Sequence, residues 1–412
     1  MAKTKKNTSD MVIVGGGVAG LTLATLLSGI GMQIHLIEPH PPEPFSTTDV
    51  SGRTVALMQS SLNILNVAGL SKFCAEYGTP LERMQIYDQS IANQPAIISE
   101  FDSFDLGLEY FGRNIPNALL RAKLYEQIQN EQSITVHSGK NFESFTKENA
   151  TSLSVRLNDD TQLNTKLLIG ADGRSSSVRT TAQIKTNKKT YDQSAITLVM
   201  NHSRAHNNVS TEFHRPGGPF AIVPLKGNQS SIVWVEKTEK AEELMRLPKD
   251  AFEQALQEQT HDILGGVSIE TSPQSWPLCS IRAQALTAPR IALIAEAAHV
   301  MSPITAQGLN LSLRDVAALS EIIADALRLG EDIGSQNVLN RYERRRSFDI
   351  KTRSFSVNSL NSIVSSDTPV VKDMRRIGLK LLNRVAPLKL FAMQHGLAPQ
   401  MDLGRLANGK AL

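Results

Sequence analysis

The sequence predicts an α/β protein in which a parallel-sheet domain is interleaved with a β-sheet domain and followed by a C-terminal helical region. Three observations predict this class: a strand–glycine turn–helix–strand unit near the N-terminus, apolar strands at 166–170 and 291–295 that end in polar residues, and alternating apolar segments between them. With 412 residues, 41% of them hydrophobic and 20% charged, the chain can bury one large core or two coupled ones.

Charge and cysteine content exclude several classes of function. The 43 basic and 40 acidic residues leave a formal charge of only +3, which argues against a nucleic-acid partner. Cys74 and Cys279 lie far apart, with no CxxC pair and no histidine at ligand spacing. We therefore expect neither a disulfide framework nor a metal site, and the reducing cytoplasm is the expected compartment.

The N-terminus imitates a signal peptide, because three lysines precede the apolar run 11–27. The glycines inside that run, Asp10 at its start and the lack of a small-residue cleavage site argue against export. We interpret residues 1–9 as a flexible basic tail.

The run 11–37 predicts a βαβ unit. Residues 11–14 form a buried strand, residues 18–30 a helix and residues 33–37 a second strand, with a glycine-rich turn between the first two. Such a unit is typical of a Rossmann-like domain that binds a dinucleotide.

The turn carries GxGxxG. Gly15 makes the turn, Gly17 lets backbone N–H groups approach a pyrophosphate at the helix N-terminus, and Gly20 lets helix and strand pack closely. Glu38 ends the second strand, where a carboxylate can accept both ribose hydroxyls of an adenosine. GxGxxG alone is a weak signal, but here it stands in register with both strands and the acid. Both NAD and FAD enzymes share this unit.

A second motif, "TKLLIGADGRSSSVRT", places Asp172 and Gly173 after the strand 166–170. The sheet would hold Asp172 beside the first nucleotide site, and Gly173 permits a close backbone passage. Taken alone, Asp-Gly after a strand is more often a plain turn.

The third motif is "IALIAEAAHVMSPITAQGLNLSLRD", in which the strand 291–295 breaks and a helix restarts at about residue 309. A helix that begins beside a flavin ring directs its positive end at the locus where charge collects on reduction. Glu296 would reach the ribityl hydroxyls. The alternative is a plain strand-to-helix loop.

The order of these motifs, with "GRTVALMQSS" after the first, resembles the single-component FAD-dependent aromatic hydroxylases of the para-hydroxybenzoate hydroxylase type. Within them the chain is most similar to the ubiquinone-biosynthesis hydroxylase family, from about residue 11 to residue 399. "GPFAIVPL", "SIVWVE" and "LFAMQHGLAP" extend the resemblance.

Motifs and resemblance together predict the residues that hold FAD. The resemblance adds Arg53, near flavin and pyrophosphate, and Arg121, on a helix covering the cofactor; either could instead be an ordinary solvated arginine. The predicted cofactor-binding residues are Gly15, Gly17, Gly20, Glu38, Arg53, Arg121, Asp172, Gly173, Glu296, Pro303, Gln307, Gly308 and Asn310.

The chain departs from the family pattern at three positions. Ala295-Glu296 replaces the usual Gly-Asp, and Ala306 replaces the usual glycine before Gln-Gly. We expect reduced affinity for FAD, whereas Glu for Asp keeps the acceptor chemistry.

The resemblance implies that NAD(P)H reduces FAD, that O2 is activated at the flavin, and that a hydroxyl group passes to an electron-rich phenol. An apolar pocket must then exclude water. Tyr191, His214 and His299 are candidate proton carriers, but each has a structural alternative, so no catalytic residue is predicted.

We expect a discontinuous Rossmann-like FAD-binding domain interleaved with a β-sheet substrate domain and followed by a C-terminal helical region. The predicted FAD-binding segments are 10–80, 116–185 and 286–335; the substrate segments are 81–115 and 190–285; the helical region is 336–412.

The helical region contains a basic and apolar segment, residues 370–386, that Pro387 should end or kink. Such a helix can lie on an anionic membrane, which suits a polyprenylated substrate. Its apolar stripe could equally pack on the protein's own core or on a partner. The chain is thus expected in the cytoplasm, with peripheral contact at the inner face of the membrane or within a quinone-biosynthesis complex.

Three functions remain open. The first is hydroxylation of a prenylated aromatic ring with FAD, NAD(P)H and O2. The second is a related flavin enzyme acting on a soluble phenol, or a reductase or halogenase, although Trp234 and Trp276 do not form the WxWxIP of halogenases. The third is a non-catalytic FAD- or lipid-binding accessory subunit of a quinone-biosynthesis complex.

Overall fold

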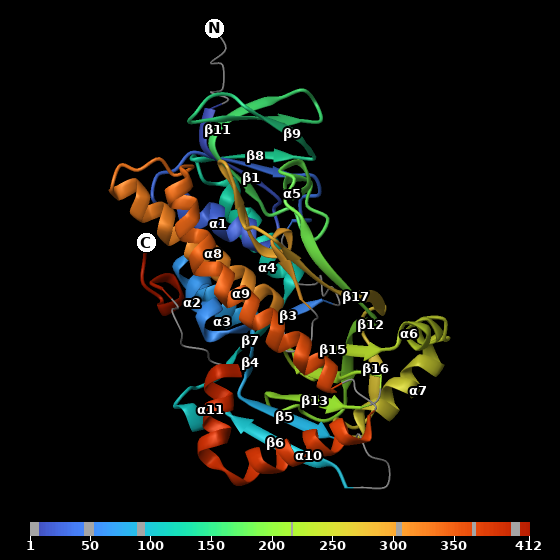
Figure 1. Cartoon of the computed structure of the whole chain (residues 1–412). Coiled ribbons are helices and arrows are strands. Elements are labelled where there is room, and N and C mark those ends of the chain that lie inside the picture. The colour runs from blue at the N-terminus through green and yellow to red at the C-terminus, as the bar shows by residue number, and fades with distance from the viewer. Residues whose placement is uncertain are drawn as a thin grey trace.

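The computed structural model describes residues 8–44, 53–88, 95–215, 217–301, 307–364, 368–396 and 404–412. Two large sheets occupy opposite halves of the molecule, and two long helices, α8 and α9, run along one side of it (Figure 1). Pro303 and Ala306, both singled out in the sequence, lie outside the described residues.

The first sheet has five parallel strands in the order β19-β11-β1-β2-β8. β18 (Thr287–Ala288) pairs antiparallel with β19, and the hairpin of β9 (Phe142–Lys147) and β10 (Leu153–Leu157) extends β11. The parallel strands are β1 (Thr8–Val14), β2 (Ile34–Glu38), β8 (Ile134–Ser138), β11 (Gln162–Gly170) and β19 (Ile291–Leu293).

The predicted βαβ unit forms this sheet's centre. Helix α1 (Val18–Ser28) connects β1 to β2 and packs against α4 (Asn117–Gln129) and α8 (Gln307–Arg328). Because both faces of the central parallel strands are covered, each has a buried apolar run, as in Met11 to Val14 of β1 and Leu167 to Ile169 of β11. The largest apolar core lies here.

The second sheet has the order β20-β17-β12-β15-β14-β13-β5-β6, with β16 (Val267–Ile269) beside β12. Helices α6 (Thr238–Met245) and α7 (Lys249–Thr260) contribute to its apolar core. The strands are β5 (Arg83–Asp88), β6 (Ile97–Asp102), β12 (Thr186–His202), β13 (Val209–His214), β14 (Phe220–Pro224), β15 (Gln229–Glu236), β17 (Gln274–Ala283) and β20 (His299–Val300).

A small sheet, β3 (Thr54–Met58), β7 (Gly112–Pro116) and β4 (Thr79–Leu81), lies between the two large sheets (Figure 1). Helices α2 (Gln59–Val67) and α3 (Ser71–Tyr77) follow β3 in the chain. Thr54 joins this sheet to the second one, because its Oγ1 donates to Ser231 Oγ at 2.7 Å.

The C-terminal region is helical. α9 (Gln336–Val364) runs beside α8, and α10 (Pro369–Arg384) and α11 (Ala386–Gly396) lie against β5 and β6 at the end of the molecule opposite β8 and β9 (Figure 1). The break expected at Pro387 is found at Val385, since proline lacks the N–H that would continue the helix. No helix in the described segments is long and apolar enough to cross a bilayer.

The predicted α/β class with a Rossmann-like unit is confirmed. The exact domain boundaries stay a prediction. β7 joins the small sheet and β20 joins the second large one, whereas β5 and β6 join the second sheet through the parallel pair β5–β13.

Candidate functional site

The motifs found in the sequence meet at one edge of the first sheet. Val14 is in register with Ile37 on one side and Gly170 on the other, and Gly170 is in register with Leu293. The carboxyl ends of these four parallel strands therefore meet at the same edge, which is where α/β sheets bind ligands. Glu38 is the last residue of β2, and Gly15, Asp172 and Glu296 lie just beyond the ends of β1, β11 and β19.

Gly15 and Gly20 are required by the protein's own backbone. Gly15 has φ +111°, and a Cβ there would lie 2.3 Å from the Ala171 carbonyl oxygen. A Cβ on Gly20 would lie 2.1 Å from the Gly15 carbonyl oxygen. Neither position can hold a side chain without separating helix α1 from the strands.

Gly17 and Gly308, by contrast, are not required by contacts with the described protein backbone. A Cβ at either position would meet no described atom within 4 Å, and neither glycine has a positive φ. The fold therefore does not itself demand glycine at these two helix starts, α1 and α8. Space left bare beside a helix N-terminus fits the close approach of a cofactor's phosphate or ring, so the residues present fit a bound dinucleotide.

Glu38 is buried at the end of β2 and already holds the glycine turn. Its Oε2 accepts a hydrogen bond from the Gly16 N–H at 2.5 Å, and Oε1 accepts one from the His40 N–H at 2.7 Å. A Cβ on Gly16 would lie 2.7 Å from Oε2. Gly16 thus belongs to the site, although the GxGxxG pattern leaves that position open.

Arg121 is not a simply solvated arginine. From α4 it donates through Nε to the Gly16 carbonyl at 2.8 Å and through Nη2 to the His40 carbonyl at 2.6 Å, and it lies 3.3 Å from Glu38 Oε2. It therefore clamps the glycine turn to the end of β2.

Asp172 helps to cap helix α5 (Ser177–Thr181), whose N-cap residue is Ser176. Its carboxylate accepts from Ser176 Oγ at 2.5 Å and from the Val178 N–H at 3.1 Å. Gly173 has φ +79°, which favours glycine. The turn-type role considered for this motif is thus present, and Asp172 lies at the same sheet edge as Glu38.

Glu296 lies in the 3-10 turn Ala295–Ala297 that follows β19, and its carboxylate is 3.6 Å from Arg174 Nε. Ala295 has φ +56°, a left-handed conformation that an alanine adopts at a cost. Its N–H donates to Asp315 Oδ2 at 3.0 Å. The position where this chain departs from the family's glycine is therefore one where glycine would be unstrained.

Asp315 is a fully buried carboxylate that joins three elements. Besides Ala295, it accepts from His299 Nε2 at 2.6 Å and from Arg346 Nε at 2.7 Å. Burial alone would raise the pKa of Asp315, but the charges and hydrogen bonds of His299 and Arg346 hold it below its usual value. His299 is thus a hydrogen-bonding partner within this buried cluster, and the sequence pattern did not reveal Asp315 or Arg346.

Asn310 fixes the first turn of α8 to the small sheet. Its Oδ1 accepts from the Met58 N–H at 2.9 Å and from Ser61 Oγ at 2.7 Å, and its Nδ2 donates to the Ala56 carbonyl at 2.8 Å. Gln307 accepts from Arg353 Nη1 at 3.2 Å. Both predicted residues therefore position the N-terminus of α8.

Arg53, Tyr191 and His214 lie at or in the second sheet: Tyr191 is in β12, His214 is in β13, and Arg53 contacts Trp276 of β17. The Arg53 guanidinium lies 4.8 Å from the Trp276 ring centroid, at the border with the second sheet. His214 pairs with Glu212 on its own strand, and burial raises the pKa of Tyr191.

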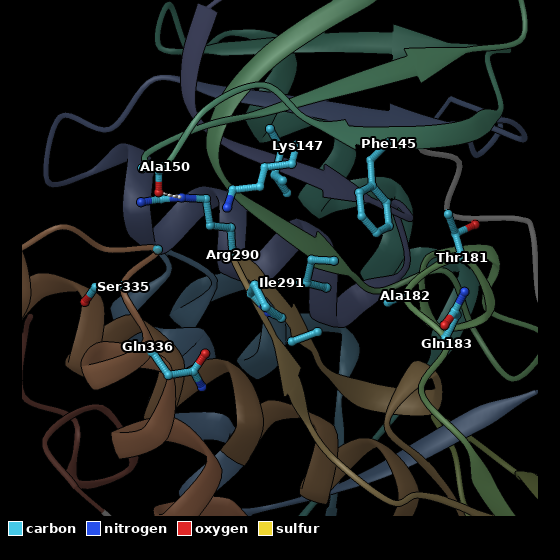
Figure 2. Close-up of a pocket in the computed structure, with 14 residues that line it drawn as sticks. Phe145, Lys147, Ala150, Thr181, Ala182, Gln183, Arg290, Ile291, Ser335 and Gln336 are labelled. Carbon is cyan, nitrogen blue, oxygen red and sulfur yellow. Dashed lines mark hydrogen bonds between the residues drawn. The ribbon is translucent and has the colours of Figure 1, made fainter.

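A cavity of about 380 Å³ opens elsewhere, at the amino end of β19 (Figure 2). Phe145, Ala182 and Ile291 contribute to its wall. The neighbouring Arg290 is bound to Asp332 and donates to the Ala150 carbonyl, so its charge is engaged. The cavity lies away from the carboxyl edge and is not the candidate site.

The fold and the sheet edge define an α/β protein that binds a dinucleotide. Residues 8–352 match the family model described as an FAD binding domain. The ubiquinone hydroxylase UbiL of Rhodospirillum rubrum is 31% identical over 94% of this chain and 89% of its own. The 3-demethoxyubiquinol 3-hydroxylase of Escherichia coli is 27% identical over 94% and 98%. The crystal structure of P. aeruginosa PqsL with 2-aminobenzoylacetate superposes with a TM-score of 0.76, at 20% identity over 90% and 99% of the two chains.

The chain belongs to the ubiquinone-biosynthesis hydroxylase family of FAD-dependent monooxygenases. The resemblance inferred from its motifs is thereby confirmed. It is an enzyme whose cofactor is FAD, and NAD(P)H is the co-substrate typical of the family.

Proposed function

We propose that this protein hydroxylates the aromatic ring of a prenylated phenol in ubiquinone biosynthesis, with NAD(P)H and O2. The observation that carries the proposal is the meeting of four strand ends at one sheet edge, in a chain related over nearly its whole length to ubiquinone hydroxylases. The fold brings the predicted cofactor-binding motifs to one edge of the sheet, and the similarity to ubiquinone hydroxylases supports the substrate class.

The predicted residues fall into two groups: those proposed to contact FAD, and those that hold the glycine turn and the start of α8 in place. Gly17 and Gly308 leave room for the cofactor at two helix starts, and Glu38 retains acceptor capacity for a ribose beyond its two N–H partners. Gly15, Gly20 and Arg121 hold the turn, while Asn310 and Gln307 hold the start of α8. Bound FAD supplies the electron transfer and the activation of O2.

Glu296 is proposed to face the cofactor with its charge moderated by Arg174. An acceptor carboxylate 3.6 Å from a guanidinium is partly neutralised, and both groups are part-exposed, so either can turn toward a ligand. Asp172 supports this edge by helping to cap α5 and so placing Arg174 and Gly173.

The protein must also exclude water from the reacting ring. A cluster of apolar side chains adjoins the start of α8, because Met58 of β3 is held there by Asn310. We call it the methionine-lined cluster; it comprises Met58, Phe101, Phe111 and Met393 with Ala56, Met84, Ile86 and Leu106. Methionine side chains adapt their shape readily, which suits an isoprenoid tail.

The test compares two phenols that differ only in a short prenyl tail. FAD-loaded protein should oxidise NAD(P)H faster with the tailed phenol, with a kcat/KM higher by roughly 10-fold or more, since each buried methylene contributes about 0.8 kcal/mol. Equal kcat/KM values would instead assign a soluble phenol as substrate. A folded protein that binds no FAD would support the accessory-subunit role.

We also propose that the protein meets its tailed substrate at a membrane or within a biosynthetic complex. The exposed basic and apolar C-terminal segment supports such peripheral contact.

A further inference from the structure

Helix α10 is turned so that two of its arginines, Arg375 and Arg376, face inward. Arg375 and Arg376 are only 8% and 6% exposed. Arg375 Nε donates to the buried Asp88 at 2.5 Å and Nη1 to the Val364 carbonyl, while Arg376 Nη2 donates to the Pro95 carbonyl at 2.9 Å. These two residues therefore do not form part of the exposed basic face expected from the sequence.

The opposite face of α10 is apolar and exposed. Val370, Met374, Ile377 and Leu381 recur at spacings of four and three, which places them in one stripe along the helix. Their side chains are 65%, 68%, 64% and 48% exposed. The stripe does not pack on the core, as one reading of the sequence allowed.

The apolar surface continues onto the next elements. Leu388 and Phe391 of α11 are exposed, and so is Phe104 of the short turn η1 (Ser103–Leu106). Lys389 of α11 pairs with Asp105 of η1 at 3.1 Å, which joins the two elements. Several exposed apolar side chains on elements that contact one another, as α10, α11 and η1 do, mark an interaction site.

The charged side chains around the apolar stripe of α10 indicate which kind of surface it binds. Residues 369–396 contain six basic side chains and one acidic one, and two of the basic ones, Arg375 and Arg376, are buried. The basic side chains that are not buried still outnumber the acidic one; they are Lys372, Lys380, Arg384 and Lys389, against Asp373. Lys380 and Arg384 are exposed and lie one helical turn beyond Ile377 and Leu381 respectively. Apolar side chains flanked by cations are typical of a helix lying in an anionic lipid interface.

A second copy of the chain fits this surface less well. In a two-fold symmetric contact the same patch meets itself, so a patch that carries Lys380 and Arg384 would face a second patch with the same cations. Like charges brought together in this way oppose association.

We infer that the outward face of α10 and α11 docks on an anionic lipid surface. This deepens the proposed function, because Met393 of α11 is buried in the methionine-lined cluster, which extends to Met58 beside the start of α8. A tailed substrate dissolved in the bilayer would thus find apolar side chains between the docking face and the candidate site.

The test is sedimentation of the FAD-loaded full chain with vesicles of phosphatidylcholine, with and without phosphatidylglycerol, in the absence of NAD(P)H and phenol. Wild type should sediment with the anionic vesicles, and less so as salt rises. Met374→Asp/Ile377→Asp should weaken binding at least roughly 10-fold, because carboxylates replace side chains that enter the interface. Leu329→Asp should bind like wild type, since Leu329 is 70% exposed on the α8–α9 connection, away from α10 (Figure 1).

Thermal unfolding verifies that each variant folds, and Leu381→Asp alone serves if the double variant does not. Wild type that stays in the supernatant with every vesicle would overturn the inference, as would a folded stripe variant that sediments like wild type. A lipid-free dimer that Met374→Asp/Ile377→Asp disperses would assign the face to a second copy instead. Since sedimentation requires no turnover, it can succeed while the tailed-phenol assay fails, and the two proposals remain separable.

Discussion

Gly17 and Gly20 stand three residues apart in the same motif but meet different constraints. A Cβ on Gly20 would clash with the Gly15 carbonyl oxygen, whereas a Cβ on Gly17, the N-cap residue of α1, would meet no described atom within 4 Å. Substitution of Gly20 therefore tests what the fold requires, and substitution of Gly17 tests what cofactor binding requires.

We expect Gly17→Ala to leave the free energy of unfolding of the FAD-free protein within about 1 kcal/mol of wild type. The added methyl group should nevertheless weaken FAD binding roughly 10-fold or more, which corresponds to about 1.4 kcal/mol. Fluorescence titration with FAD and urea unfolding measure the two quantities. Gly20→Ala is the matched control and should destabilise the FAD-free protein by about 2 to 3 kcal/mol. Unchanged FAD affinity in Gly17→Ala would remove Gly17 from the site.

Ala295 is the residue at which backbone strain coincides with a departure from the family pattern. We expect Ala295→Val to cost about 1 to 3 kcal/mol, because a β-branched side chain is poorly tolerated at φ +56°. Ala295→Gly should stay within about 1 kcal/mol of wild type, since relief of strain offsets the lost methyl group. Urea unfolding of both variants checks this. Equal stability of the two variants would show that the left-handed backbone is not retained in solution.

The glycine turn and Glu38 could be predicted because each depends on neighbours close in sequence: a strand, a tight turn and a helix start. The roles of Asp172, Asn310 and Arg121 could not be predicted in full. Asn310 bonds to Met58, 252 residues earlier in the chain, and only the folded chain brings such partners together. Their motif positions were visible, but their hydrogen bonds were not.

Three elements, the turn after β19, strand β20 and helix α9, converge on Asp315 of α8. The carboxylate is ionised at neutral pH because His299 and Arg346 lower its pKa against the effect of burial. A carboxyl group with a lowered pKa in the folded state stabilises the fold above its unfolded pKa of about 3.9, and this contribution is lost as the pH falls through the folded value.

Asp315→Asn should therefore destabilise the protein by about 3 to 5 kcal/mol near pH 7, because it removes the buried charge that His299 and Arg346 share and leaves Arg346 with Asp349 as its remaining carboxylate partner. The difference in free energy of unfolding between wild type and variant should narrow as the pH falls below about 3.9, because the unfolded wild type then takes up a proton that the folded Asp315, with its lowered pKa, does not. Denaturant unfolding at about pH 7 and about pH 3.5 measures both differences. A gap that stays constant over that interval would show that the carboxylate charge is not what Asp315 contributes.

Helix α10 shows what helical periodicity can and cannot predict. The spacing of apolar and basic residues correctly indicated an amphipathic helix that ends before Pro387. Periodicity does not say which face is buried, since that depends on Asp88 of β5, which lies 287 residues from Arg375. Because Arg375 and Arg376 bind the buried Asp88, their side of α10 faces inward and the apolar stripe is exposed.

In the molecule as a whole, the parallel sheet was predictable from apolar runs that end in glycine or acid, because both faces of such strands are covered. The small sheet of β3, β4 and β7 was not predicted, since its strands are short and lie far apart in sequence. It nevertheless joins the second large sheet to the start of α8, through Thr54 and Met58. The candidate site therefore depends on the whole chain's arrangement.

The most direct test of the proposed hydroxylation is the mass of the product formed from a short-tailed prenylphenol by FAD-loaded protein, NAD(P)H and isotopically labelled O2. We predict a ring product that carries one additional oxygen atom bearing the label. NAD(P)H consumption that yields only hydrogen peroxide, or a product whose new oxygen is unlabelled, would contradict the assignment of this chain as a ring hydroxylase.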